Sequence, residues 1–67
     1  MLAVNVPIRE IRYEPERTRL TIRFETASHV YVGVPPEAHR GLCESESPLD
    51  YLGREIQGAY PYNVVAA

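Results

Sequence analysis

The stretch Ser28-His29-Val30-Tyr31-Val32-Gly33-Val34-Pro35 alternates strictly between valines and other side chains. A period of two over this length indicates a β-strand with one buried face. We expect the valines to point into a core and the residues between them to point outward. The outward set is then His29, Tyr31 and Gly33. The chain before this stretch would supply strands that pair with it, and the chain after it would supply helices that cover its valines.

Two further strands are predicted before this stretch. Residues 19–25 alternate between apolar and polar side chains, and residues 8–13 place Ile11 and Tyr13 on one face. A turn at residues 14–18 joins them, since proline at its second position presets the backbone angle. Three consecutive strands with short connections form an antiparallel meander. Residues 3–8 would form either an edge strand or an ordered arm, because Pro7 is excluded from a central strand.

Two short helices are predicted after the meander. The first spans residues 36–44, with proline in its first turn. The second begins at Ser47-Pro48 and carries Leu49, Leu52 and Ile56 on one face. We therefore expect an α+β fold in which two short helices cover one face of a three-stranded antiparallel meander. Residues 63–65 would either add an edge strand or pack on the core.

Length and composition limit what the chain can be. Sixty-seven residues, 45% of them hydrophobic, make a single globular domain (residues 1–67, core about 6–65). Its one cysteine has no partner for an internal disulfide, which fits a reducing cytoplasm. No apolar run approaches the length of a membrane span, and no signal peptide is evident. The net charge is −2, so long-range attraction to nucleic acid is weak.

Catalytic and metal sites are weakly supported by the sequence. Cys43 and His39 lie four residues apart on one helical face, but a third group and an oxyanion loop are missing. We interpret the pair as a structural cysteine beside a surface histidine. With His29 added, these are the only soft metal ligands, and His29 is predicted on the opposite face of the sheet. We expect no enzyme activity, no cofactor and no metal.

The face opposite the valines is the candidate binding site. Its members are arginine and aromatic side chains: Arg12, Arg19, Arg23, His29 and Tyr31. Such a face could stack on single-stranded bases and hold phosphates. The competing interpretations are an ordinary solvated face with cross-strand Arg–Glu pairs, and a surface for a protein partner or a second copy of the chain.

The corner Tyr60-Pro61-Tyr62 also has two interpretations. Its rings would either close the open end of the core or extend a stacking surface. We favour the first.

The pattern as a whole resembles the KTSC domain. The resemblance rests on Leu20-x-Ile22-x-Phe24, on an aromatic-x-Tyr before Val34-Pro35, and above all on the segment from Tyr51-Leu52 to Tyr60-Pro61-Tyr62. It covers about residues 6–65. The family is named after the C-terminal domain of some lysyl-tRNA synthetases and has no established function. The occurrence of the domain in lysyl-tRNA synthetases implies RNA, either tRNA or single-stranded RNA, as a partner.

Two departures from the family pattern bear on that implication. His29 stands where the family has a tyrosine, and Gln57 and Ala59 replace positions that are often basic. Arg54 is the cation left in that segment. The predicted function is that of a small non-enzymatic binding module. Its predicted partner is RNA or, alternatively, another protein or a second copy of the chain. A membrane is not expected as a partner. The candidate binding residues are Arg12, Arg23, His29, Tyr31, Arg54, Tyr60 and Tyr62.

Overall fold

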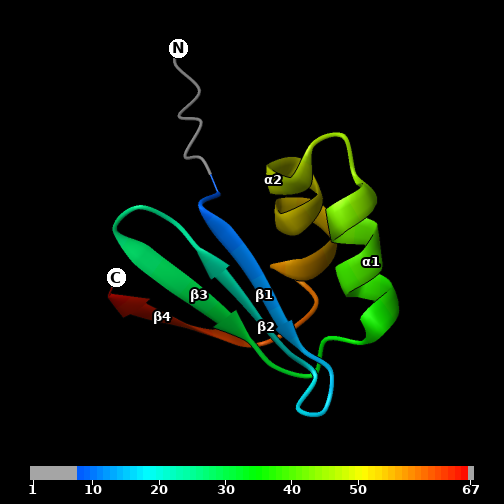
Figure 1. Ribbon diagram of the computed structural model, residues 1–67, viewed down its shortest axis with the longest axis horizontal. Coiled ribbons are helices and arrows are strands. Elements are labelled where there is room, and N and C mark those ends of the chain that lie inside the picture. Colours follow the sequence, from blue (N-terminus) through cyan, green and yellow to red (C-terminus); the bar gives the residue numbers. More distant parts are fainter. Residues whose placement is uncertain (1–7, 67) are drawn as a thin grey trace.

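The computed structural model describes residues 8–66 and shows an α+β fold (Figure 1). Within these residues the sheet has four antiparallel strands in the order β1-β2-β3-β4. The strands are β1 (Glu10–Glu14), β2 (Arg19–Arg23), β3 (Ala27–Tyr31) and β4 (Tyr62–Ala66). The predicted meander is confirmed. Of the two alternatives for residues 63–65, the structure shows the edge strand, so the sheet has a fourth strand. The prediction for residues 3–8 lies almost wholly outside the described part of the chain.

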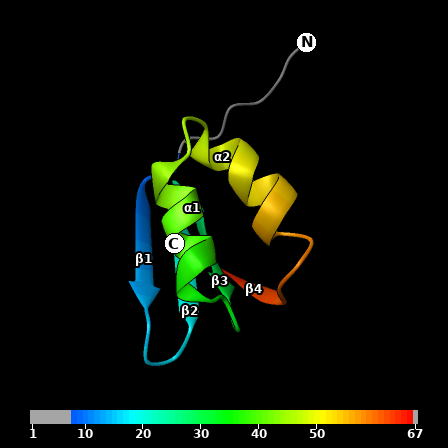
Figure 2. The same ribbon diagram turned by 90° about the vertical axis from the view of Figure 1, so that its right-hand side faces the viewer.

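The helices lie together on one face of the sheet. They are α1 (Pro36–Glu44), α2 (Pro48–Tyr51) and the π-helical turn η1 (Leu52–Ile56), which continues α2 directly. Figure 2 shows α1 in front of the sheet, with α2 and η1 extending toward the side of β3 and β4. The two predicted helical segments are therefore confirmed, and the second one widens into a π turn at Leu52.

One buried cluster joins the sheet to the helices. From the sheet and the connection after it come Leu20, Ile22, Phe24, Tyr31 and Val34, and from the helices come Leu42, Leu52 and Ile56. Burial of such side chains is worth roughly 1.5–3 kcal/mol each. The apolar residues of the predicted strand 19–25 are all in this cluster, whereas Ile11 and Tyr13 of β1 are partly buried against it. The prediction fails at β3, where Tyr31 is buried and Val32 is exposed.

The predicted facing of β3 is wrong. Tyr31 pairs with Leu20, and His29 pairs with Ile22. Residues directly opposite in an antiparallel pair share a face, so His29 and Tyr31 lie on the core side. Tyr31 is fully buried, whereas Val32 is 46% exposed. Alternation predicted the presence of this strand, although the strand ends at Tyr31 and does not reach Val34. It could not decide which of the two apolar faces packs inward.

Gly33 explains why Val34 is nevertheless buried. The glycine has a φ of 75°, a left-handed conformation that glycine adopts without steric cost. This turn breaks the alternation that Tyr31 sets and returns Val34 to the core, where it is fully buried. The Val34 carbonyl then accepts a hydrogen bond of 2.7 Å from the Tyr13 hydroxyl, which closes the end of the sheet.

Candidate functional site

The side of the sheet away from the helices is a charged surface, which we call the outer face. It forms a shallow depression lined by Glu10, Arg12, Glu14, Arg19, Thr21, Arg23, Ser28 and Val30. The register explains this set, because each of these residues pairs with another of them across β1, β2 or β3. Two predicted site residues, Arg12 and Arg23, are brought together here.

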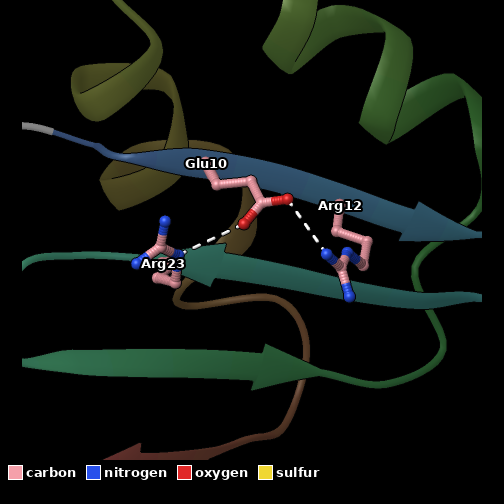
Figure 3. A network of polar contacts seen from close by, with 3 residues as sticks. All are labelled: Glu10, Arg12 and Arg23. Atoms are coloured by element: carbon pink, nitrogen blue, oxygen red, sulfur yellow. Dashed lines mark hydrogen bonds and ion pairs between the residues drawn. The ribbon is translucent and has the colours of Figure 1, made fainter. Parts of the chain in front are cut away.

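Glu10 holds both of these arginines (Figure 3). Its carboxylate accepts hydrogen bonds from the Arg12 Nη2 at 3.1 Å and from the Arg23 Nε at 3.2 Å. Arg12, and to a lesser degree Arg23, lowers the pKa of the Glu10 carboxyl below its usual value. Arg19 pairs in the same way with Glu14 at 2.9 Å. Two of these contacts, Arg23 with Glu10 and Arg19 with Glu14, are cross-strand Arg–Glu pairs of the kind that one interpretation of this face predicted.

The aromatic site residues lie on the opposite face, where they form what we call the aromatic row: Phe24, His29, Tyr31 and Tyr62. The His29 ring lies 5.3 Å from Tyr62 in a stacked arrangement and 5.0 Å from Phe24 in an edge arrangement. Tyr31 and Tyr62 are 4.9 Å apart. These contacts follow from the pairing of β3 with β2 and β4. The predicted combination of His29 and Tyr31 with Arg12 and Arg23 on one surface is therefore wrong.

Burial changes the chemistry of Tyr31. Loss of solvent, with a smaller contribution from Tyr62, raises the pKa of Tyr31 to about 12. The hydroxyl thus keeps its proton at any physiological pH, and it lies 3.4 Å from the His29 Nδ1. This hydroxyl can donate to the imidazole or accept from it, so the direction of the hydrogen bond follows the tautomer of His29.

A groove lies between β3 and the segment of α2 and η1. Its volume is about 470 Å³, and it is lined by Phe24, Thr26, Ala27, His29, Leu49, Leu52, Gly53 and Gln57. The π turn contributes Leu52 and Gly53, and such turns are frequent at functional sites. The sequence did not predict this groove. It arises from a helix widening and from the inward facing of His29, and neither has a local sequence signal.

The remaining predicted site residues lie apart from the arginine pair. Arg54 is on η1, exposed, with its Nε 3.6 Å from the Asp50 carboxylate. Tyr60 is partly buried against the core, as the structural interpretation of the corner expected. Tyr62 is 37% exposed, and its hydroxyl accepts a hydrogen bond of 3.3 Å from the Gln57 amide. The corner thus links the end of the helical segment to β4.

His39 and Cys43 do meet on α1, as their spacing predicts. The Cys43 Sγ lies 3.3 Å from the His39 Nε2, and the His39 ring stacks on Tyr13 at 4.5 Å. Residues 8–66 bring no three His, Cys, Asp or Glu side chains into a group that could hold a metal ion. None of the helices in the same range is long and apolar enough to cross a membrane.

The edge strand β4 is the most exposed element of the sheet. All five of its residues are exposed, and Val64 and Val65 keep 60% and 51% of their surface in solvent. Its sequence, Tyr-Asn-Val-Val-Ala, carries no charge. In the described part of the chain, no strand lies beyond it. The uncharged valine pair is the sequence signal from which this surface could have been predicted.

Comparison with known proteins gives the family. The KTSC domain family matches residues 6–60, which is most of the chain. The chain therefore belongs to the KTSC domain family, as the resemblance indicated. Among curated proteins, none matches the chain. The family match includes β1, β2, β3 and the helices, and it ends just before β4.

Proposed function

We propose that this chain is a non-enzymatic protein-interaction module, acting in the cytoplasm, that binds an extended segment of a partner along the open edge of β4. The observation that carries the proposal is that β4 is uncharged and that all five of its residues are exposed. Natural edge strands are usually protected by charged side chains, by prolines or by a covering element. An unprotected edge offers backbone hydrogen bonds to an added strand, which is a recurring mode of protein recognition.

The other edge of the sheet supports this choice by contrast. β1 carries the charged residues Glu10, Arg12 and Glu14, which are engaged in ion pairs. Charges along an edge disfavour the addition of a further strand. The two edges of one sheet thus differ in the property that governs strand addition.

RNA binding is the second candidate, and it has less support. The outer-face arginines could contact phosphates, but Arg12, Arg19 and Arg23 each pair with a glutamate. The aromatic rings that would stack on bases lie on the other side of the sheet. An RNA ligand would therefore bind through phosphate contacts alone, which are salt-dependent.

Amide NMR titrations of the labelled chain test both candidates. The first probe is a capped peptide of alternating valine and threonine between terminal lysines, and the second is a pool of short RNAs and tRNA at low and moderate salt. Peptide-induced shifts at Tyr62, Val64 and Ala66 would support the proposed function. Salt-sensitive RNA shifts at Arg12 and Arg23, without a response of β4 to the peptide, would overturn it in favour of RNA. No response to either probe, at a concentration where the chain is monomeric, would also overturn it.

A further inference from the structure

The pairing of β4 with β3 determines which residues of β4 direct their backbone N–H and C=O groups toward the open edge. The Val32 N–H donates to the Pro61 carbonyl at 3.1 Å, one step beyond the Tyr31–Tyr62 pair. In an antiparallel ladder, hydrogen-bonded pairs alternate with pairs that make no such bonds. Asn63 and Val65 therefore direct their backbone groups toward β3, and Tyr62, Val64 and Ala66 direct theirs toward the open edge.

The other side of β3 gives the same phase independently. The Phe24 N–H donates to the Ala27 carbonyl at 2.8 Å, one step beyond the Arg23–Ser28 pair. By alternation, Ala27, His29 and Tyr31 direct their backbone groups toward β2. Ser28 and Val30 are left to bond to β4, opposite Val65 and Asn63. Two separate hydrogen bonds, from Val32 to Pro61 and from Phe24 to Ala27, thus both indicate that the backbone groups of Val64 point toward the open edge.

We propose that the occupant of this edge is β4 of a second copy of the chain, paired antiparallel about a twofold axis at Val64. This inference rests on the proposed function, because it names the partner of the same edge. In this register Val64 lies opposite Val64 of the partner subunit, and Tyr62 lies opposite the partner's Ala66. Every outward backbone group of β4 then has a strand residue opposite it. Registers centred on Asn63 or Val65 leave Ala66 or Tyr62 without one.

Side-chain size and charge fit the same register. The large Tyr62 ring meets a small alanine, and two valines meet at the axis on the face that carries the aromatic row. β4 has no charge that symmetry would place beside its own copy. Pairing β1 with itself about Arg12 would instead oppose arginine to arginine and Glu10 to Glu14. The symmetric interface therefore belongs to β4.

The dimer should be a reversible one. β4 has five residues, and an interface of one such strand is small compared with the interfaces of permanent dimers. We expect monomer and dimer to exchange at roughly micromolar to millimolar concentrations.

Single cysteines report the register directly. We place cysteine at 63, 64 or 65 in a background that carries Cys43→Ser, and we oxidise each variant with a glutathione couple. Hydrogen-bonded antiparallel pairs have Cα atoms about 5.5 Å apart, within the range of a disulfide. Val64→Cys should cross-link to a dimer at least about tenfold faster than Asn63→Cys or Val65→Cys. Faster cross-linking at 63 or 65, or equal rates at all three, would overturn the proposed register.

A proline tests the backbone contact without depending on cysteine chemistry. Val64→Pro removes an N–H that points away from β3, so the β3–β4 ladder is retained, whereas Val64→Thr keeps the N–H as a matched control. By sedimentation equilibrium, the dimer of the proline variant should dissociate at least about tenfold more readily than that of the threonine variant. Equal dissociation constants, or a monomeric wild-type chain at all concentrations, would overturn the inference. A monomeric chain whose β4 amides still respond to the valine–threonine peptide would overturn the dimer and leave the proposed function standing.

Discussion

At the scale of single residues, Tyr31 decides how β3 is placed. Both faces of this strand carry apolar side chains, and the face with the larger aromatic surface is the one that is buried. The tyrosine brings its hydroxyl into the core, where the hydroxyl lies near His29. One consequence of this burial can be measured as a function of pH.

We expect the wild-type chain to lose stability between about pH 10 and pH 12 through Tyr31. An unfolded tyrosine loses its proton near pH 10, but the folded chain holds this proton up to a pKa of about 12. Between these values the unfolded state binds fewer protons than the folded state, so rising pH favours unfolding. The free energy of unfolding, measured with urea across this range, should fall more steeply for wild type than for Tyr31→Phe.

Tyr62→Phe is the matched control for this measurement. Its hydroxyl is on an exposed side chain, and its removal leaves the burial of Tyr31 in place. The steep fall should therefore persist in this variant. Equal slopes for wild type and Tyr31→Phe would show that the buried hydroxyl does not govern stability at high pH.

The charged residues were easier to predict than Tyr31. Arginine and glutamate alternate with apolar residues along β1 and β2, so their place on the outer face followed from the period of two. Cross-strand pairs such as Glu10 with Arg23 then required only the correct register. In β3 the period gave two apolar faces instead of one, and the choice between them depends on packing that no local pattern contains.

At the scale of elements, the helical segment is held together by a close approach of α1 to α2. A Cβ added at Gly41 would overlap the Tyr51 hydroxyl, so the ring lies directly against the glycine. Tyr51 in turn packs against the core. A glycine inside a helix costs about 1 kcal/mol relative to alanine, and here this cost permits the contact.

Alanine should therefore have opposite effects at Gly41 and at Gly53. Gly53 has open space where a Cβ would lie, so Gly53→Ala should raise the free energy of unfolding by about 0.5–1 kcal/mol. At Gly41 the displaced Tyr51 ring should outweigh the gain in helix propensity and lower that free energy by about 1 kcal/mol. Urea denaturation of both variants measures the difference. Stabilisation of both variants to the same extent would contradict the close approach.

Element boundaries were predictable to different degrees. The helix Pro36–Glu44 has the predicted bounds, because Pro35 and Pro36 mark its start. The widening at Leu52 was not predictable, because the same apolar spacing suits an α-helix and a π turn. β4 was left between two alternatives for a related reason: a short apolar segment after a proline can add to an edge or pack on a core.

At the scale of the whole molecule, the sheet separates two groups of residues, arginines and aromatic residues, that we had predicted to form one site. The outer face holds the paired arginines, and the helix side holds the aromatic row. The four-stranded sheet shows its least protected surface at β4, at the edge that Figure 1 places farthest from β1. The proposed interaction accordingly uses an edge of the sheet and not a face.

Stability should depend on protein concentration if copies pair through β4. A partner that binds only the folded state stabilises it by mass action. For a domain of this size, a tenfold rise in concentration should raise the Tm by about 3–6 °C once the dimer predominates. Differential scanning calorimetry over a concentration series measures this shift. The Val64→Pro variant should show no such rise, and an equal rise in both chains would contradict pairing at this edge.

The position of β4 in the chain also governs the order in which the sheet is completed. β1, β2 and β3 are joined by short connections, whereas the whole helical segment separates β3 from β4. Closing that long loop costs more entropy than closing a hairpin, so the last strand should add after the meander has formed. β4 also has a single neighbouring strand, and such elements open locally at a lower free energy than the core. Backbone amides of β4 that bond to β3 should therefore exchange with deuterium sooner than those between β2 and β3, and each brief opening would bare the edge of β3 as well.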